Sequence, residues 1–267
     1  MTLAERLRAL YPQASNRSLK QWLEAGRVTV DGRPCRDGRL EIGAGARVAL
    51  GGRPAVPFPR GLTLVHEDEA IVVVAKPPGL LTIATDRERE RTAYRLLWDY
   101  LAARGERPFI VHRLDRETSG LLVFAKSEAA KRALQAQFEA RTVERVYRAL
   151  VAGRPAREAG TLESRLAEDR RLRVRAGERG RLAITHYRVL ERRRPGALLE
   201  LRLGTGRRQQ IRVQLADAGW PIVGDVAHGG PRGRAGRLCL HATRLGFVHP
   251  LTGRTVVFES APPADWV

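Results

Sequence analysis

The sequence predicts an α+β protein, with a small N-terminal α/β domain and a larger domain on a large, mainly antiparallel mixed sheet flanked by helices. Three observations predict this class. After residue 61, strand-like and helix-like apolar segments mix without a regular βαβ repeat. The first 51 residues have a compact apolar pattern of their own. Between the two parts, residues 51–59 hold three prolines and two glycines and show no periodicity.

These observations set the domain limits. We expect a first domain over residues 1–51, a linker over 52–61 and a second domain over 62–267. The linker should be semi-rigid where its prolines cluster, because proline restricts the backbone.

Two helices should open the first domain. Thr2 and Glu5 stand at the spacing of a capping box, which predicts the start of a first helix. A second helix should start near Ser15 or Asn16 and stop at Gly26. The residues expected on the buried faces of these helices are Leu3, Leu7, Leu10, Leu19, Trp22 and Leu23.

A small sheet should complete the first domain, with a strand at 28–30, a turn at 31–32 and a strand at 47–50. The second helix and the segment that follows it, residues 24–32, resemble the αL RNA-binding motif first recognised in a small-subunit ribosomal protein. This resemblance implies an RNA-binding domain whose phosphate contacts come from Arg17, Lys20 and Arg27. A solvated basic face is the alternative interpretation of these residues.

The second domain should contain several well-marked elements. Residues 71–75 are typical of a buried strand, and the alternation over 143–151 predicts a strand that carries Tyr147. Ser127 should cap a helix that buries Ala130, Leu134 and Phe138. Further along, the pattern predicts a strand at 199–203 and a helix over 208–218.

The most informative segment is HRLDRETSG, residues 112–120, in which Asp115 lies between two arginines. A carboxylate beside guanidinium groups stays ionised at neutral pH, because nearby positive charge favours the charged form. Such a group suits nucleophilic chemistry on an anionic substrate. The alternative is an ordinary aspartate in a tight turn, with the Thr-Ser-Gly that follows as turn chemistry.

This segment resembles the active-site signature of RNA pseudouridine synthases of the RluA family, which convert RNA uridines into their carbon-linked isomer. Four further segments match that family in the same order, and together the matches span roughly residues 61–263. These segments are residues 76–80, 145–150, 205–213 and 240–250.

The resemblance implies a set of site residues. Asp115 would be the essential catalytic carboxylate, Tyr147 would stack on the target uracil, and Arg212 would form an ion pair with Asp115. Further substrate-binding residues would be Lys76, His112, Arg113 and Arg207. From the residues alone, a packed structural His112, a simple turn at Lys76, a helix-surface Arg212 and an ordinary half-buried Tyr147 remain open.

The chain departs from the family pattern at two places. Gln209 and Gln214 stand at two positions where the family has histidine, so we expect these side chains to support structure or RNA contacts. Residues 227–229, Ala-His-Gly, stand where the family commonly has Tyr-Gly. Neither departure touches Asp115, Tyr147 or Arg212.

Composition indicates the partner. Lys plus Arg number 48 against 29 Asp plus Glu, and the resulting charge of +19 favours a polyanion such as RNA. Cys35 and Cys239 are isolated, which argues against a zinc site or a disulfide scaffold. Isomerisation oxidises and hydrolyses nothing, so we expect no cofactor.

The chain also lacks an N-terminal apolar core typical of a signal peptide and any apolar run of membrane-spanning length. We therefore expect a soluble, cytoplasmic monomer.

The predicted function is an isomerase that converts specific uridines of structured RNA to pseudouridine, with ribosomal RNA favoured and transfer RNA possible. A catalytically silent RNA-binding module would share the charge, but it has no use for Asp115, Tyr147 and Arg212 together. An RNA nuclease commonly needs a carboxylate cluster or a histidine pair, and a nucleoside hydrolase has no use for a charge of +19.

Overall fold

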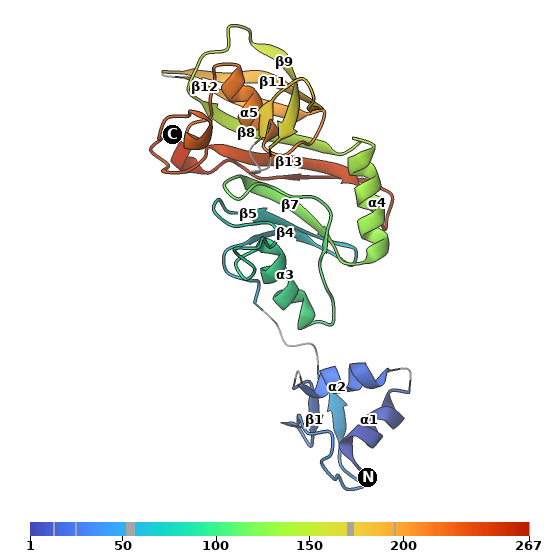
Figure 1. Ribbon diagram of the computed structural model, residues 1–267. Helices are drawn as coiled ribbons and strands as arrows, with labels where there is room; N and C mark the ends of the chain where they lie inside the picture. Colours follow the sequence, from blue (N-terminus) through green and yellow to red (C-terminus); the bar gives the residue numbers. More distant parts are fainter. Residues whose placement is uncertain (13, 25, 52–56, 170–173, 195, 267) are drawn as a thin grey trace. The chain divides into compact units, whose positions relative to one another are not determined.

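The structure is a computed structural model that describes residues 1–267 except 13, 25, 52–56, 170–173, 195 and 267, and except the side chains of 17 and 21. It divides into two compact units, residues 1–58 with 99–106, and residues 59–98 with 107–267 (Figure 1). Half of the predicted linker, residues 52–56, lies outside the described residues.

The N-terminal unit holds two helices and a three-stranded sheet in the order β2-β1-β3. Its elements are α1 (Leu3–Leu10), α2 (Asn16–Glu24), β1 (Val28–Val30), β2 (Arg33–Pro34) and β3 (Val48–Leu50). The predicted capping box is confirmed, because the Glu5 N–H donates to the Thr2 hydroxyl and the Thr2 N–H donates to the Glu5 carboxylate. The predicted turn is also confirmed, since Asp31 and Gly32 both have positive φ, at 50° and 81°.

One predicted core position of this unit is wrong. Leu10 is 46% exposed, whereas Leu3 and Leu7 on the same helix are fully buried. Helix α1 ends at Leu10, and the next residue, Tyr11, packs on the core instead, with its ring 5.3 Å from that of Trp22.

The second unit is built on an eleven-stranded sheet in the order β10-β9-β11-β12-β8-β13-β7-β5-β4, with β6 beside β7 and β14 beside β13 (Figure 1). Among the described strand pairs, all are antiparallel except β7 with β13. The predicted α+β class, with a large, mainly antiparallel mixed sheet, is therefore confirmed. The strands are β4 (Thr63–Glu67), β5 (Ile71–Lys76), β6 (Phe109–Ile110), β7 (Ser119–Ala125), β8 (Glu144–Val151), β9 (Ala159–Glu168), β10 (Val174–Ala176), β11 (Arg181–Arg193), β12 (Gly196–Leu203), β13 (Leu240–Val248) and β14 (Thr255–Glu259).

After the N-terminal elements, the described helices are α3 (Ala93–Ala102), which spans the division between the two units, α4 (Glu128–Glu139), α5 (Gln210–Asp217) and the short 3₁₀ turns η1 (Val226–His228) and η2 (Ala264–Trp266). Ser127 caps α4 as predicted, because its hydroxyl accepts from the Ala130 N–H at 3.1 Å. Helix α5 begins two residues later than predicted. Gln209 has a φ of 51°, in the left-handed region, so the right-handed helix cannot include it.

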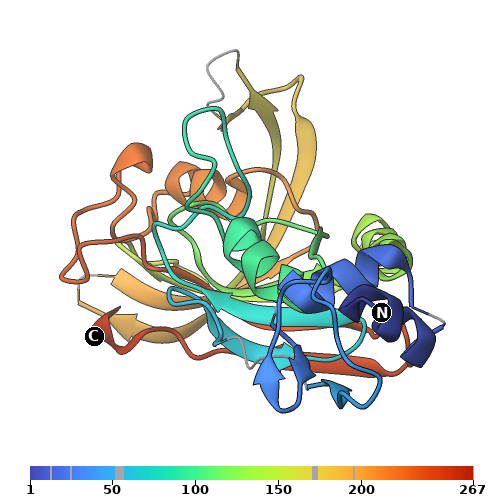
Figure 2. The same cartoon turned by 90° about the horizontal axis from the view of Figure 1, so that it is seen from below.

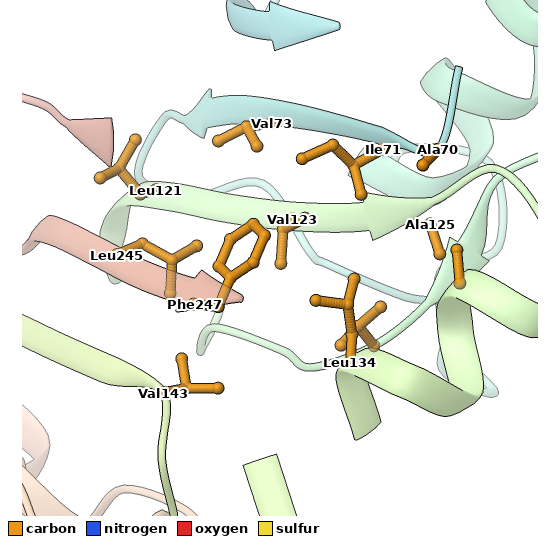
Figure 3. Packing of buried hydrophobic residues seen from close by; sticks show 12 residues of the cluster. Ala70, Ile71, Val73, Leu121, Val123, Ala125, Leu134, Val143, Leu245 and Phe247 are labelled. Atoms are coloured by element: carbon orange, nitrogen blue, oxygen red, sulfur yellow. The ribbon is translucent and has the colours of Figure 1, made fainter. Parts of the chain in front are cut away.

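One hydrophobic core lies between α4 and the strands β5, β7 and β13 (Figure 3). Val73, Val123 and Phe247 come from the three strands, and Leu134 faces them from α4. Strand β7 is buried along its whole length. The loop that carries Asp115 runs directly into this strand, so the core anchors one end of that loop.

Gly120, at the start of β7, fixes how β7 meets β13. The two strands pair in parallel through Gly120 and Ala242, and the φ of Gly120 is 110°. A Cβ atom at residue 120 would lie 2.3 Å from the Ala242 carbonyl oxygen. Only glycine allows this close approach of the two backbones.

Strands β9, β10 and β11 form the other end of the sheet, and the yellow strands of this end rise above the central strands in Figure 2. Within the arginine-rich stretch 168–181, of which residues 170–173 lie outside the described part, strand β10 pairs with β9. Within the described part of the chain, no helix is long and apolar enough to cross a membrane.

Gly120→Ala should lower the free energy of unfolding by about 3 kcal/mol, because the added methyl group meets the β13 backbone. Urea unfolding measures the change. The matched control is Gly177→Ala, where a Cβ meets nothing within 4 Å, and its effect should stay within about 0.5 kcal/mol. Equal losses in the two variants would contradict the steric role of Gly120.

Candidate active site

Asp115 lies in the loop between β6 and β7, and hydrogen bonds hold the loop backbone on both sides of it. The Thr82 hydroxyl donates to the Leu114 carbonyl at 2.9 Å and accepts from the Leu114 N–H at 3.1 Å. The Thr118 N–H donates to the Asp115 carbonyl at 3.2 Å and closes a turn. The Asp115 side chain remains 21% exposed. The backbone is thus a tight turn, and the turn presents the carboxylate.

Lys76 is a second clamp on this loop. Its side chain is only 1% exposed, and its ammonium donates to the carbonyls of Pro77, Leu80 and Arg116 at 2.8–3.1 Å. Burial lowers the pKa of Lys76 to about 7, against the negative charges of Glu117 and Asp115, which raise it. An ammonium whose three protons are used inside the protein has none for an RNA phosphate.

A cavity of about 250 Å³ opens at Asp115. Most of its lining comes from three segments that are remote in sequence, the Asp115 loop, strand β8 and the segment from Gly206 into α5, and Leu203 and Leu240 complete it. It brings together five of the predicted site residues, Arg113, Asp115, Tyr147, Arg207 and Arg212.

Tyr147 enters this cavity from β8, whose neighbours in the sheet are β12 and β13. The side chain is 8% exposed. Burial raises the pKa of Tyr147 to about 12; Arg145 opposes this shift, and the negative charge of Asp115 adds to it. The phenol is therefore protonated at neutral pH and can donate a hydrogen bond.

Arg212 holds two carboxylates, and the stronger contact is not the predicted one. Its Nε and Nη2 atoms donate to the two carboxylate oxygens of Asp225, both at 2.7 Å. Its Nη1 atom lies 3.8 Å from Asp115 Oδ2. The predicted ion pair with Asp115 is present at that distance, but the two parallel hydrogen bonds go to Asp225.

Asp225 is the site residue that sequence reasoning missed. It is 2% exposed, and its Oδ1 atom also lies 3.0 Å from Nδ1 of His228, at the position where the family commonly has tyrosine. Burial alone raises the pKa of Asp225, but hydrogen bonds from Arg212 and His228 outweigh burial and hold the pKa at about 2. The pair therefore carries fixed opposite charges behind the cavity.

His112 is packed against the core side of the loop. Its ring stacks on Phe138 with centroids 4.7 Å apart, and its Nε2 atom accepts from the Val123 N–H at 3.2 Å. Burial lowers the pKa of His112 to about 3, and the positive charge of Arg145 contributes. The surroundings of this neutral ring are those of a packed, structural histidine.

The remaining predicted residues have mixed surroundings. Arg113 is exposed, and Arg207 donates from Nε to the Leu182 carbonyl at 3.1 Å.

The two glutamines at positions where the family has histidine differ in their surroundings. Gln214 is 3% exposed and donates to the Leu162 and Ala183 carbonyls, so it supports structure. Gln209 lines the cavity.

The predicted RNA contacts of the N-terminal unit stay predictions. Lys20 is exposed and lies 3.8 Å from Glu24. Arg27 donates to the Gly51 carbonyl and lies over the Trp22 ring. The side chain of Arg17 lies outside the described residues. Over the part of the chain that the structure describes, no three His, Cys, Asp or Glu residues are grouped to hold a metal ion.

Comparison with known proteins places this site in context. A model of the family described as RNA pseudouridylate synthase matches residues 70–217. The chain is similar to "Ribosomal large subunit pseudouridine synthase D" of Neisseria meningitidis serogroup A, with 36% identity over 97% of this chain and 75% of that protein. It is also 42% identical to an "Uncharacterized RNA pseudouridine synthase" of Chloroflexus aurantiacus, over 95% of this chain and 84% of that protein.

Among solved structures, the fold is similar to "Human RNA Pseudouridylate Synthase Domain Containing 4". The TM-score is 0.64 and the sequence identity 25%, over 76% of this chain and 90% of that chain.

Because His112 is neutral in the folded protein, the free energy of unfolding should depend on pH. The pKa of this histidine is near 6.5 in the unfolded chain and about 3 in the folded protein, so between these values only the unfolded chain binds the proton. Stability is therefore full above pH 6.5 and falls as the pH decreases below it. His112→Gln keeps a hydrogen-bond acceptor for the Val123 N–H. It should lower the slope of stability against pH by up to about 1.4 kcal/mol per pH unit. Urea unfolding between pH 7 and 4.5 measures both slopes. The control is His186→Gln, at an exposed histidine; identical slopes for the parent and the His112 variant would rule out the buried neutral ring.

Proposed function

The chain belongs to the RNA pseudouridylate synthase family, and on that basis we propose that it isomerises specific uridines of ribosomal RNA with Asp115 as the essential carboxylate. The enzyme is an RNA pseudouridine synthase, as the sequence motifs predict. The observation that supports the assignment to Asp115 is the cavity itself. It gathers Asp115, Tyr147 and Arg212 from three remote segments around a space that is open to solvent.

The reaction requires one carboxylate at a fixed position and little else from the protein. The bond from ribose C1′ to N1 of uracil breaks, the base turns, a bond from C1′ to C5 forms, C5 loses its proton and N1 gains one. Glycosidases usually need a second carboxylate to protonate the leaving group. A uracil anion delocalises its own charge, so one carboxylate suffices. Asp115 would attack the sugar or the base covalently, or stabilise the positive charge that develops at C1′.

Tyr147 supplies the surface for the extruded base in this proposal. Taking a base out of its stack costs a few kcal/mol. Stacking on an aromatic ring returns about 1–3 kcal/mol per base. The raised pKa of Tyr147 means that the phenol meets the base with its proton in place. Arginines around the cavity, Arg113 and Arg207 among them, would hold the flanking phosphates.

Arg212 would position Asp115, and Asp225 would position Arg212. The two short bonds to Asp225 fix the plane of the guanidinium and leave Nη1 toward Asp115. A planar, five-donor group can contact two carboxylates at once, whereas an ammonium is a point charge on a flexible stem.

Ribosomal RNA is the proposed substrate because of a relative's name and because of charge. The Neisseria relative is named for the large ribosomal subunit, and the net charge of +19 suits a large polyanion. Transfer RNA would be the other outcome of a mapping experiment. We expect the enzyme to act on this RNA as a cytoplasmic monomer, with residues 1–51 as an additional RNA-binding domain.

Asp115→Asn should abolish pseudouridine formation and leave RNA affinity within a few-fold of the parent, because asparagine keeps the shape and loses the charge. Ribosomal and transfer RNA from cells that lack the protein are incubated with each variant, and pseudouridine is then mapped by mass spectrometry after a pseudouridine-specific label. New pseudouridine at a defined ribosomal site is expected with the parent alone. Normal turnover by Asp115→Asn would remove Asp115 from its role, and a new site in transfer RNA only would correct the substrate.

Arg212→Lys keeps the positive charge and should still lose about a hundredfold in single-turnover rate at saturating enzyme, because the lysine cannot grip Asp225 and face Asp115 together. RNA affinity should change little. Arg208→Lys is the matched control, since Arg208 also lines the cavity but pairs with Glu168. A near-parental rate for Arg212→Lys would make Arg212 a simple phosphate contact.

Deletion of residues 1–51 should weaken binding of ribosomal RNA by about tenfold and reduce its salt dependence. Those residues carry nine Lys or Arg and five Asp or Glu, a net charge of +4. The single-turnover rate at saturating enzyme should fall less than the affinity. Unchanged affinity and salt dependence would assign the N-terminal unit another role.

A further inference from the structure

A second cavity, of about 520 Å³, adjoins the one at Asp115. The two share part of their lining, including Tyr147, Gly206 and Arg207. The second cavity extends from there to Phe138 in α4 and to Arg145 at the start of β8. The two cavities are therefore neighbours on either side of these shared residues.

The second cavity is strongly basic. Four arginines line it, Arg113, Arg141, Arg145 and Arg207, against one carboxylate, Glu139. Among the described residues, none of these arginines forms an ion pair. Uncompensated guanidinium groups in a concave site concentrate positive potential and attract an anion.

Arg145 is the central feature of this cavity. Its Nε atom is buried and has no hydrogen-bond partner. Its guanidinium lies over the Phe138 ring at 5.7 Å, and a Cβ atom at residue 206 would come within 2.5 Å of its Nη1. Burial lowers the pKa of Arg145; Tyr147 opposes this shift and Arg141 adds to it. A buried donor without a partner costs about 1–3 kcal/mol, so the protein itself does not satisfy this guanidinium, which lines the cavity.

Arg141 adds a second, independent observation. It follows Ala140, the C-terminal cap of α4, and its φ is 60°. That left-handed position after a helix is usually glycine, and an L-residue with a side chain costs about 1 kcal/mol or more there. The chain nevertheless has an arginine at this strained position, beside Arg145 in the same cavity.

We infer that the second cavity binds a phosphodiester group of the RNA chain next to the nucleotide held at Asp115, with Arg145 as the main ligand and Arg141 beside it. A guanidinium group holds a phosphate through two parallel hydrogen bonds. Arg145 and Tyr147 lie two residues apart on one face of β8, about 7 Å along the strand. A phosphate on the target nucleotide or its neighbour can therefore reach Arg145 while the base meets Tyr147. This inference rests on the proposed function.

The test uses 5′-fluorescein-labelled nonauridylate as the probe and the full-length protein, with binding followed by fluorescence anisotropy over a range of KCl concentrations. Arg145→Gln should weaken binding about fivefold and lower the slope of log K against log salt by about 0.7, the value for one phosphate contact on a single strand. Arg254→Gln is the matched control, an exposed arginine of the same unit that loses the same charge. Equal slopes for the parent and Arg145→Gln, or equal losses in the two variants, would overturn the inference.

A second measurement is made on the parent protein and does not depend on whether Arg145→Gln folds. In the parent protein, the Nε–H resonance of Arg145, assigned by its loss in Arg145→Lys, should shift on addition of nonauridylate with the dissociation constant seen by anisotropy. No shift would overturn the inference, and so would an equal shift with the same phosphate concentration of inorganic phosphate, which would make the site one for free phosphate. Binding of nonauridylate is separate from pseudouridine formation in ribosomal RNA, so each proposal can fail without the other.

Discussion

The buried pair of Arg212 and Asp225 is the interaction on which the site depends. Both side chains are at most 10% exposed, and two hydrogen bonds of 2.7 Å join them. Taking two charges out of water is costly, and removal of one partner from such a pair typically destabilises a protein by about 3–5 kcal/mol. The pair gives the site a cation whose place is fixed before any substrate arrives. Asp115 Oδ2 lies 3.8 Å from this cation, at the edge of the cavity.

The backbone around Asp115 is fixed in the same way, from several directions. Thr82 holds the residue before Asp115, Lys76 holds the residue after it, and β7 continues into the core. Gly120 lets β7 approach β13 closely at the point where the loop ends. A carboxylate that must meet one atom of a large, flexible RNA gains rate from such preorganisation, because a misplacement of about 1 Å can cost a hundredfold.

Much of this arrangement could be predicted from the sequence, and the failures have physical causes. Local signals, such as the capping box at Thr2 and the cap at Ser127, depend on neighbouring residues and were confirmed. The resemblance names Lys76 as a site residue, but no local pattern predicts that its side chain is buried. Its three carbonyl acceptors come together only in the folded chain. Asp225 carried no signal, since its partner lies thirteen residues away across a turn and neither periodicity nor motif links the two.

A double-mutant cycle on Arg212 and Asp225 tests the central claim most directly. Single-turnover rates at saturating enzyme are measured for the parent, Arg212→Lys, Asp225→Asn and the double variant on the mapped ribosomal RNA. If the two residues act as one unit that positions Asp115, each single change should cost about a hundredfold and the double change about the same. Losses that multiply to about ten thousandfold, or an Asp225→Asn rate close to that of the parent, would contradict this account.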